Sequence, residues 1–167
     1  MNRREWLQQQ IISNNYKIGA ELGILKGPTF KYLIENCPSL TLIGVDVFTP
    51  DRYWKHSNID LKDIKPMYWY DDLIEFSDKY KPRAKIIRGF TNKVHQDIEN
   101  NSLDFIFIDA SHDKPSVIED IKNWEPKVKK GGLVSGHDIN ILDVKLAVNE
   151  VNMNYQEGPD NIWWWNK

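Results

Sequence analysis

The chain of 167 residues has little of what marks several classes of protein. It contains one cysteine, Cys37, which excludes an internal disulfide bond and fits a reducing compartment. It has no apolar run of membrane-spanning length, and its first residues lack the apolar core of a secretion signal. Its 22 Lys and Arg residues do not outnumber its 24 Asp and Glu residues, so nucleic acid is not the expected partner. These absences predict a cytoplasmic protein that binds neither membranes nor nucleic acid.

Two glycine patterns that bind phosphate groups are also missing. The GxGxxG of nicotinamide sites is absent, because the glycines of the first strand and turn fall at Gly19, Gly23 and Gly27. The GxxxxGK[ST] of nucleoside triphosphate sites is absent as well. A nucleotide with a pyrophosphate is therefore not the expected ligand.

The most informative segment that is present, residues 18–29, has the pattern of a short strand, a glycine-rich turn and a helix start. Such a turn lets backbone N–H groups approach a ligand, because glycine carries no side chain. Asp46 comes 23 residues after Gly23, at the end of the apolar stretch 40–46. An acid at that position can accept hydrogen bonds from both hydroxyls of a ribose. The turn and the acid together predict a site for an adenosine-type cofactor without a pyrophosphate.

The apolar patterns predict one domain, residues 1–167, in which strands and helices alternate. Strands are expected at residues 17–22, 40–47, 85–88, 103–109, 133–135, 155–156 and 162–165, and helices at 2–14, 28–36, 68–80, 114–128 and 142–151. Gly131 and Gly132 are expected to form the turn into the strand at 133–135. This alternation predicts an α/β fold, a parallel sheet with helices on both faces that binds ligands at the carboxyl ends of its strands.

Residues 48–67 show no clear periodicity, and a loop of this length is usually functional or mobile. Its aromatic residues Tyr53, Trp54 and His56 could form a lid over a substrate or pack against their own domain, and both alternatives stay open.

Three tryptophans stand together near the C-terminus. Trp163 and Trp165 are expected on one face of a strand and Trp164 on the other, because side chains alternate along a strand. This strand is expected at or near the edge of the sheet, and an exposed aromatic edge is commonly covered by a partner. We therefore predict a homo-oligomer.

A second group of polar residues follows two later strands. Asp109 ends the strand at 103–109, with His112 one short turn later, and His137 and Asp138 follow the strand at 133–135. Carboxylates and imidazoles that converge at one place are typical of a divalent metal site. In the alternative interpretation, Asp109 caps the next helix and the pair His137-Asp138 is part of a solvated loop.

With these motifs the chain resembles the class I S-adenosylmethionine-dependent methyltransferases. It is most similar to the metal-dependent small-molecule O-methyltransferases, the group of catechol O-methyltransferase and the antibiotic-sugar O-methyltransferases. The resemblance covers most of the chain, from about residue 17 to residue 167. Residues 21–29 match the E-L-G-x-x-x-G-x-[ST] cofactor loop of the family, Asp46 matches its ribose acid, and residues 89–92 match the segment beside the adenine.

The resemblance implies a Rossmann-like methyltransferase fold, with a mostly parallel seven-stranded sheet and an antiparallel C-terminal strand. It implies S-adenosyl-L-methionine as the cofactor and places Glu21 near the methionine amino group. Glu21 could instead be a charge partner of the helix N-terminus, and Thr91 and Asn92 could form a helix N-cap rather than contact adenine. The residues expected to bind the cofactor are Glu21, Gly23, Gly27, Thr29, Asp46, Val47, Gly89, Phe90, Thr91, Asp109 and Ala110.

The resemblance also implies a divalent metal, Mg²⁺ or Mn²⁺. His137 and Asp138 follow Asp109 by 28 and 29 residues, which is the family's spacing for its metal ligands. His112 stands where the catechol enzyme has its catalytic lysine, and with Asp109 it forms the expected catalytic pair. The family usually has two Asp, or Asp and Asn, where this chain has His137 and Asp138. An imidazole suits manganese, iron or zinc better than magnesium.

The predicted function is therefore metal-assisted methyl transfer from S-adenosylmethionine to a hydroxyl of a small molecule. Two alternatives stay open. One is a metal-independent N- or O-methyltransferase, and the other is a module that binds S-adenosylmethionine without catalysis.

Overall fold

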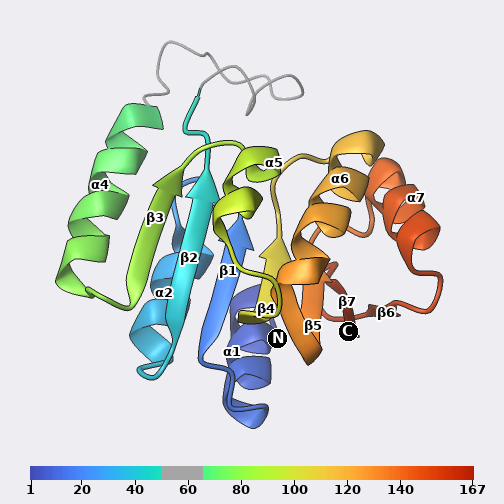
Figure 1. Cartoon of the computed structure of the whole chain (residues 1–167), viewed down its shortest axis with the longest axis horizontal. Helices are drawn as coiled ribbons and strands as arrows, with labels where there is room; N and C mark the ends of the chain where they lie inside the picture. Colours follow the sequence, from blue (N-terminus) through green and yellow to red (C-terminus); the bar gives the residue numbers. More distant parts are fainter. Residues whose placement is uncertain (50–65) are drawn as a thin grey trace.

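The structure is a computed structural model, and it describes residues 1–49 and 66–167 (Figure 1). Its elements in chain order are α1 (Arg3–Ser13), β1 (Ile18–Leu22), α2 (Pro28–Asn36), β2 (Thr41–Asp46), α4 (Pro66–Lys79), β3 (Ala84–Arg88), α5 (Thr91–Val94), β4 (Leu103–Ile108), α6 (Lys114–Trp124), β5 (Val128–Gly136), α7 (Leu142–Val151), β6 (Gln156–Glu157) and β7 (Trp163–Asn166). Two 3₁₀ turns follow α5 and α6, at His95–Asp97 and Glu125–Lys127. Tyr53, Trp54 and His56, the predicted lid residues, lie outside the described residues.

One sheet contains all seven strands, in the order β3-β2-β1-β4-β5-β7-β6. The five strands from β3 to β5 are parallel, and β7 runs antiparallel to both β5 and β6. The chain winds outward in one direction from β1 through β2 to β3, and in the other from β4 to β5. This reversal leaves a crevice beyond the carboxyl ends of β1 and β4, where ligands of such sheets bind. The predicted fold class is confirmed.

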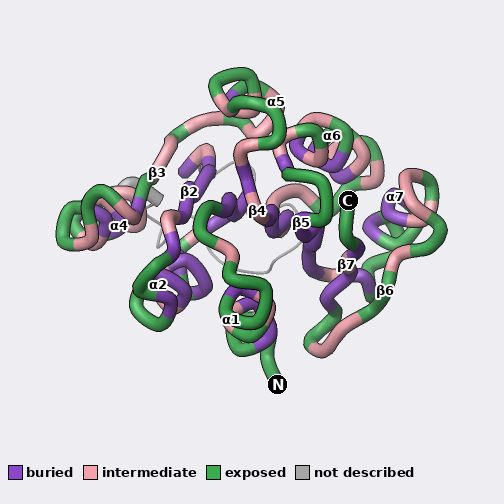
Figure 2. The backbone as a smooth tube through the Cα atoms, turned by 60° about the horizontal axis from the view of Figure 1, so that its bottom comes forward, coloured by how far each residue is buried: buried purple, intermediate pink, exposed green. Residues whose placement is uncertain are grey.

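Apolar residues bury both faces of the sheet. One core cluster joins it to α5, α6 and α7, and the other joins it to α1, α2 and α4 (Figure 2). In α2 the buried positions Phe30, Leu33 and Ile34 follow the helical period, so a single stripe faces the strands. A capping box between Asn2 and Glu5 begins α1. None of the helices formed by the described residues is long and apolar enough to span a membrane.

The predicted turn at Gly131 and Gly132 is wrong, because both residues lie within the nine-residue strand β5. Gly131 has φ +80°, and the register between β4 and β5 shifts after Leu103. The two glycines thus form an irregularity in a continuous strand rather than a turn before it. The predicted helix 114–128 is shorter than expected, because Pro126 breaks the helical hydrogen bonding and a 3₁₀ turn follows α6.

The tryptophan strand alternates as predicted and lies near the sheet edge, one strand in from it, but its aromatic side chains are not exposed. Trp163 and Trp165 are buried in the cluster with α6 and α7, and Trp164 packs in the other cluster, beside Trp6 of α1. The two-residue strand β6 forms the sheet edge instead. The homo-oligomer stays a prediction, although the exposed aromatic edge on which it was based is not present among the described residues.

Candidate functional site

A cleft of about 1400 Å³ lies at the carboxyl ends of β1, β2, β4 and β5. It brings together almost every residue that the sequence singled out. Among the residues that line it are Arg3, Glu21, Gly23, Thr29, Asp46, Val47, Gly89, Phe90, Thr91, Asp109, Ala110, His112, His137 and Asp138. Gly27 is the exception among the predicted site residues.

The first turn and Asp46 are joined by backbone hydrogen bonds. The Asp46 carboxylate accepts from the N–H of Leu25 at 2.8 Å and from the N–H of Phe48 at 2.9 Å. Burial raises the pKa of Asp46, and these backbone N–H groups oppose that rise. Asp46 therefore also fixes the turn beside it.

The two glycines of the turn have different structural reasons. Gly23 has φ +84°, and a Cβ atom there would lie 2.2 Å from the carbonyl oxygen of Asp109. Gly27 caps α2 with φ +73°, and a Cβ atom there would meet Leu73. Gly23 thus permits close packing of two strand ends, whereas Gly27 starts the helix outside the cleft.

Glu21 lies on β1 and is 3% exposed. Its Oε2 atom has no hydrogen-bond partner among the described residues. Burial, together with the nearby Asp109 carboxylate, raises the pKa of Glu21 well above its ordinary value. A buried carboxylate oxygen without a donor carries a free-energy cost that a cationic ligand would remove. The orphaned oxygen fits the amino group of a methionine moiety.

The segment after β3, residues 89–92, forms part of the cleft wall. Phe90, not Thr91 or Asn92, is the N-cap of α5, and it caps the helix without a side-chain hydrogen bond. The amide of Asn92 instead donates to Glu119 of α6, and the carbonyl of Thr91 accepts from the indole of Trp124. The N-cap alternative is therefore wrong for Thr91 and Asn92.

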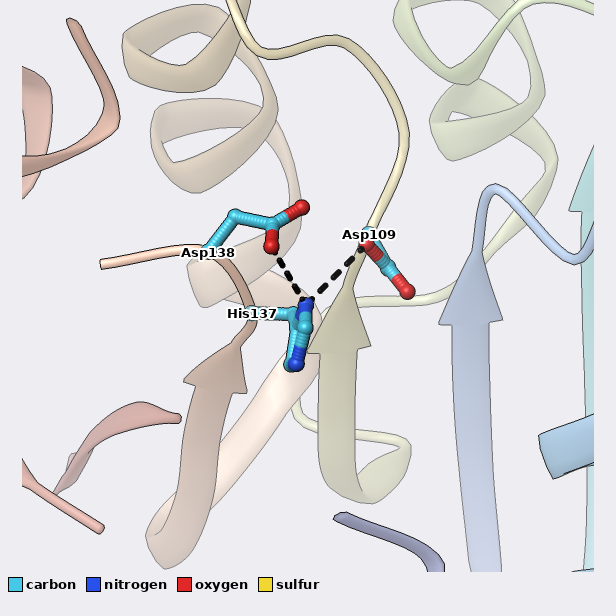
Figure 3. A group of neighbouring side chains, drawn as sticks. All are labelled: Asp109, His137 and Asp138. Carbon is cyan, nitrogen blue, oxygen red and sulfur yellow. Dashed lines mark ion pairs between the residues drawn. The ribbon is translucent and has the colours of Figure 1, made fainter. Parts of the chain in front are cut away.

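Asp109, His137 and Asp138 converge where β4 and β5 end (Figure 3). One candidate ligand atom from each lies within 4.8 Å of the other two. The Nδ1 atom of His137 is 2.9 Å from Asp138 Oδ1 and 3.9 Å from Asp109 Oδ1. Asp109 does not cap the next helix, because Asp113 does so by accepting from the N–H of Ser116. That alternative interpretation of Asp109 is wrong.

The chemistry of this group fits a divalent ion. His137 is 9% exposed, its Nε2 atom has no hydrogen-bond partner among the described residues, and its Nδ1 atom faces the Asp138 carboxylate without an aligned hydrogen bond. Burial lowers the pKa of His137, but the Asp138 and Asp109 carboxylates outweigh it and the net shift is upward. A buried imidazole nitrogen that faces two carboxylates is a donor set that a divalent metal would complete.

His112 joins the same group from the loop after β4. Its Nε2 atom lies 2.9 Å from Asp138 Oδ2 and 3.8 Å from Asp109 Oδ1. The Asp109 and Asp138 carboxylates raise the pKa of His112 to about 10. The raised pKa favours the protonated form of His112 in the ligand-free site.

Two residues of the site were missed from the sequence. Arg3 of α1 donates from Nη1 to Asp109 Oδ2 at 2.7 Å, although the two residues are 106 positions apart. The indole N–H of Trp163 donates to the carbonyl oxygen of His137 at 3.0 Å. Both contacts depend on the packing of α1 and β7, which no local pattern encodes. An arginine at the start of a helix otherwise looks like an ordinary surface residue.

Comparison with known proteins gives a family. A sequence-family profile described as a methyltransferase domain matches residues 20–139, which is more than half of the chain. An uncharacterized protein of Sinorhizobium fredii, y4gI, is 24% identical over 106 residues, which cover 57% of this chain and 12% of that protein. The matched part is therefore only about an eighth of the length of this curated relative.

Solved structures share the fold. The O-methyltransferase NovP superposes with a TM-score of 0.71 and 18% identity, over 99% of this chain and 79% of that one. An O-methyltransferase from Bacillus cereus, solved in complex with SAH, gives 0.67 and 15%, over 99% and 80%. CalS11, a TDP-rhamnose 3′-O-methyltransferase of calicheamicin biosynthesis, gives 0.69 and 14%, over 98% and 77%.

Proposed function

The chain belongs to the S-adenosylmethionine-dependent methyltransferases, and on that premise we propose that it methylates a hydroxyl of a small molecule with the help of a divalent metal. The observation that carries the proposal is the meeting of two groups in one cleft. Glu21, with its unpartnered oxygen, lines the same cleft as Asp109, His137 and Asp138. The similar structures named above are O-methyltransferases, which supports oxygen as the acceptor atom.

The residues of the first turn would position the methyl donor. Asp46 would accept from the ribose hydroxyls, and Glu21 would accept from the methionine amino group. Thr29, Val47, Ala110 and residues 89–91 would line the remaining walls. The sulfonium methyl is already electrophilic, so the main task of these residues is in-line alignment of the methyl group with the acceptor oxygen.

The second group would prepare the acceptor. Asp109, His137 and Asp138 would hold the metal, Mn²⁺ or Mg²⁺, which would lower the pKa of the acceptor hydroxyl and orient it. His112 would take the hydroxyl proton as the oxygen–methyl bond forms and the sulfur–methyl bond breaks. This role needs a neutral imidazole. A bound metal would offset the negative charge of the Asp109 and Asp138 carboxylates, which is the cause of the raised pKa of His112, and would so favour the neutral imidazole.

The test is methyl transfer from labelled S-adenosylmethionine to a panel of sugars and catechols, with added Mn²⁺ or with excess chelator. We expect transfer only with metal, and we expect the Asp138→Ala variant to behave like the chelated enzyme. The His112→Ala variant should retain metal binding and slow transfer by roughly 10²–10⁴-fold, the usual effect of losing a general base. Full transfer in excess chelator would favour a metal-independent N- or O-methyltransferase instead.

A further inference from the structure

The charge on the cleft wall is strongly uneven. Eight Asp and Glu residues line the cleft, and Arg3 is the one Lys or Arg among its described lining residues. A ligand carboxylate in this cleft would be repelled unless it lay against a positive charge or against backbone N–H groups. S-adenosylmethionine brings such a carboxylate, next to the amino group that Glu21 suits.

Arg3 has the capacity to bind a second carboxylate. A guanidinium has five N–H donors in a planar fork, and Nη1 of Arg3 donates to Asp109. Neither Nε nor Nη2 has a partner among the described residues, and the side chain is 34% exposed. Arg3 is also close enough to Glu21 to oppose the rise in its pKa. Arg3 and Glu21 both line the cleft, and Asp109, which Arg3 contacts, also influences Glu21.

The backbone of Arg3 is fixed, so its side chain starts from a defined place. The N–H of Arg3 donates to Asp160 Oδ2 at 2.9 Å. The helix it begins packs on the sheet through Trp6, whose ring centroid is 6.0 Å from that of Trp164. Arg3 also lies outside residues 20–139, the part matched by the family profile. Its assignment therefore comes from this structure.

We propose that Arg3 binds the carboxylate of the methionine moiety of S-adenosylmethionine, with Glu21 taking the adjacent amino group. The inference rests on the proposed cofactor site and adds to it a residue on α1. Cofactor binding would then depend on α1 as well as on the glycine-rich turn after β1. The competing assignment, in which Arg3 binds an anionic acceptor, is one outcome of the test.

The experiment compares two ligands that differ by one group, S-adenosylmethionine and decarboxylated S-adenosylmethionine. Their dissociation constants are measured by titration calorimetry in excess chelator, which removes any effect through a metal. In Arg3→Gln the preference for the carboxylate-bearing ligand should fall by roughly tenfold or more, the usual effect of losing a hydrogen bond between charged groups. Arg3→Lys, which keeps the charge without the fork, should give an intermediate loss.

Arg4→Gln is the matched control. It removes the same charge one residue away, where the guanidinium lies over the ring of Tyr32, 5.8 Å from its centroid, and outside the cleft lining. Both dissociation constants should stay within about twofold of the wild-type values. Because the readout is a ratio of two ligands on one variant, a general loss of stability in Arg3→Gln cancels.

An unchanged ratio in Arg3→Gln, with both ligands still bound, overturns the assignment and leaves the cofactor site standing. In that case the carboxylate is held by backbone N–H groups, or Arg3 serves an anionic acceptor. If wild-type protein binds neither ligand, the proposed function fails and the inference fails with it.

Discussion

Glu21 shows how a single residue can be unfavourable for the fold and useful for binding. In the ligand-free protein its buried Oε2 atom has no donor, and burial raises its pKa. An acid whose pKa is higher in the folded protein than in the unfolded chain lowers the unfolding free energy as pH rises above its unfolded pKa, which is about 4.3 for Glu. Whether it takes up a proton or stays charged without a partner, the Glu21 carboxyl therefore costs stability at neutral pH in the absence of a cationic ligand.

We predict that Glu21→Gln raises the unfolding free energy of the ligand-free protein at pH 7 by roughly 1–3 kcal/mol, because an amide neither titrates nor carries a charge that burial disfavours. The same change should weaken S-adenosylmethionine binding. Urea unfolding and calorimetry on the same preparation measure the two effects. A variant that is less stable and binds as tightly as wild type would contradict this account of Glu21.

At the level of the elements, two glycines with nearly the same backbone conformation allow the cost of a left-handed backbone to be measured apart from the cost of overpacking. Gly23 has φ +84° and Gly131 has φ +80°. A Cβ atom at Gly131 would have no atom within 4 Å, whereas one at Gly23 would overlap the backbone of Asp109 and Ala110. A substitution at Gly131 therefore tests the backbone conformation alone, whereas one at Gly23 also tests the packing.

We expect Gly131→Ala to lower the unfolding free energy by about 1 kcal/mol, the usual cost of a left-handed conformation. Gly23→Ala should cost a further ~1–3 kcal/mol, because the ends of β1 and β4 must separate. Chemical unfolding of both variants checks the difference. Equal losses would mean that the two strand ends are not held in close contact at Gly23.

Asp104 joins the starts of three neighbouring strands. Its carboxylate accepts from the N–H groups of Lys17 and Ile18 and from the ammonium of Lys129, at 2.6 to 2.9 Å. Burial raises the pKa of Asp104, but these donors outweigh it and the net pKa is lowered. An acid whose pKa is lowered on folding stabilises the protein at a pH above its unfolded pKa. It loses that contribution as pH falls through its folded pKa.

The unfolding free energy of wild type should therefore exceed that of Asp104→Asn by a constant amount above about pH 5, and the gap should close as pH falls below about 4. Thermal unfolding across this range measures the gap. A gap that is independent of pH would show that the carboxylate charge of Asp104 plays no part in joining the strands.

Local patterns predicted most of the elements, because the buried strands and the amphipathic helices carry their periodicity in the sequence. They also placed Asp46, Asp109, His137 and Asp138 at strand ends, where parallel strands bring them together. They failed at Gly131, since a pair of glycines is as compatible with a strand irregularity as with a turn. They also missed Arg3, whose role depends on where α1 packs.

At the scale of the whole molecule, the sheet reversal between β1 and β4 brings the proposed cofactor residues and the group Asp109, His137 and Asp138 into one cleft. The pKa values of the site residues could not be predicted from the sequence, because they depend on burial and on neighbours such as Asp138, which lies 2.9 Å from His112. The oligomeric state was predicted from an exposed aromatic strand, and the tryptophan side chains of that strand are packed inside the molecule. Light scattering at high micromolar concentration tests it, and a monomer would reject the homo-oligomer.

The central claim is that one cleft binds S-adenosylmethionine and a divalent metal through two separate sets of residues. The most direct measurement titrates Mn²⁺, followed by electron paramagnetic resonance, into wild-type protein saturated with S-adenosylmethionine and into its Asp138→Ala and Asp46→Ala variants. We predict one bound Mn²⁺ per chain in wild type, loss of Mn²⁺ but not of the cofactor in Asp138→Ala, and cofactor binding weaker by about 1–3 kcal/mol with Mn²⁺ retained in Asp46→Ala. Wild-type protein that binds the cofactor and leaves all Mn²⁺ free in solution would contradict the claim.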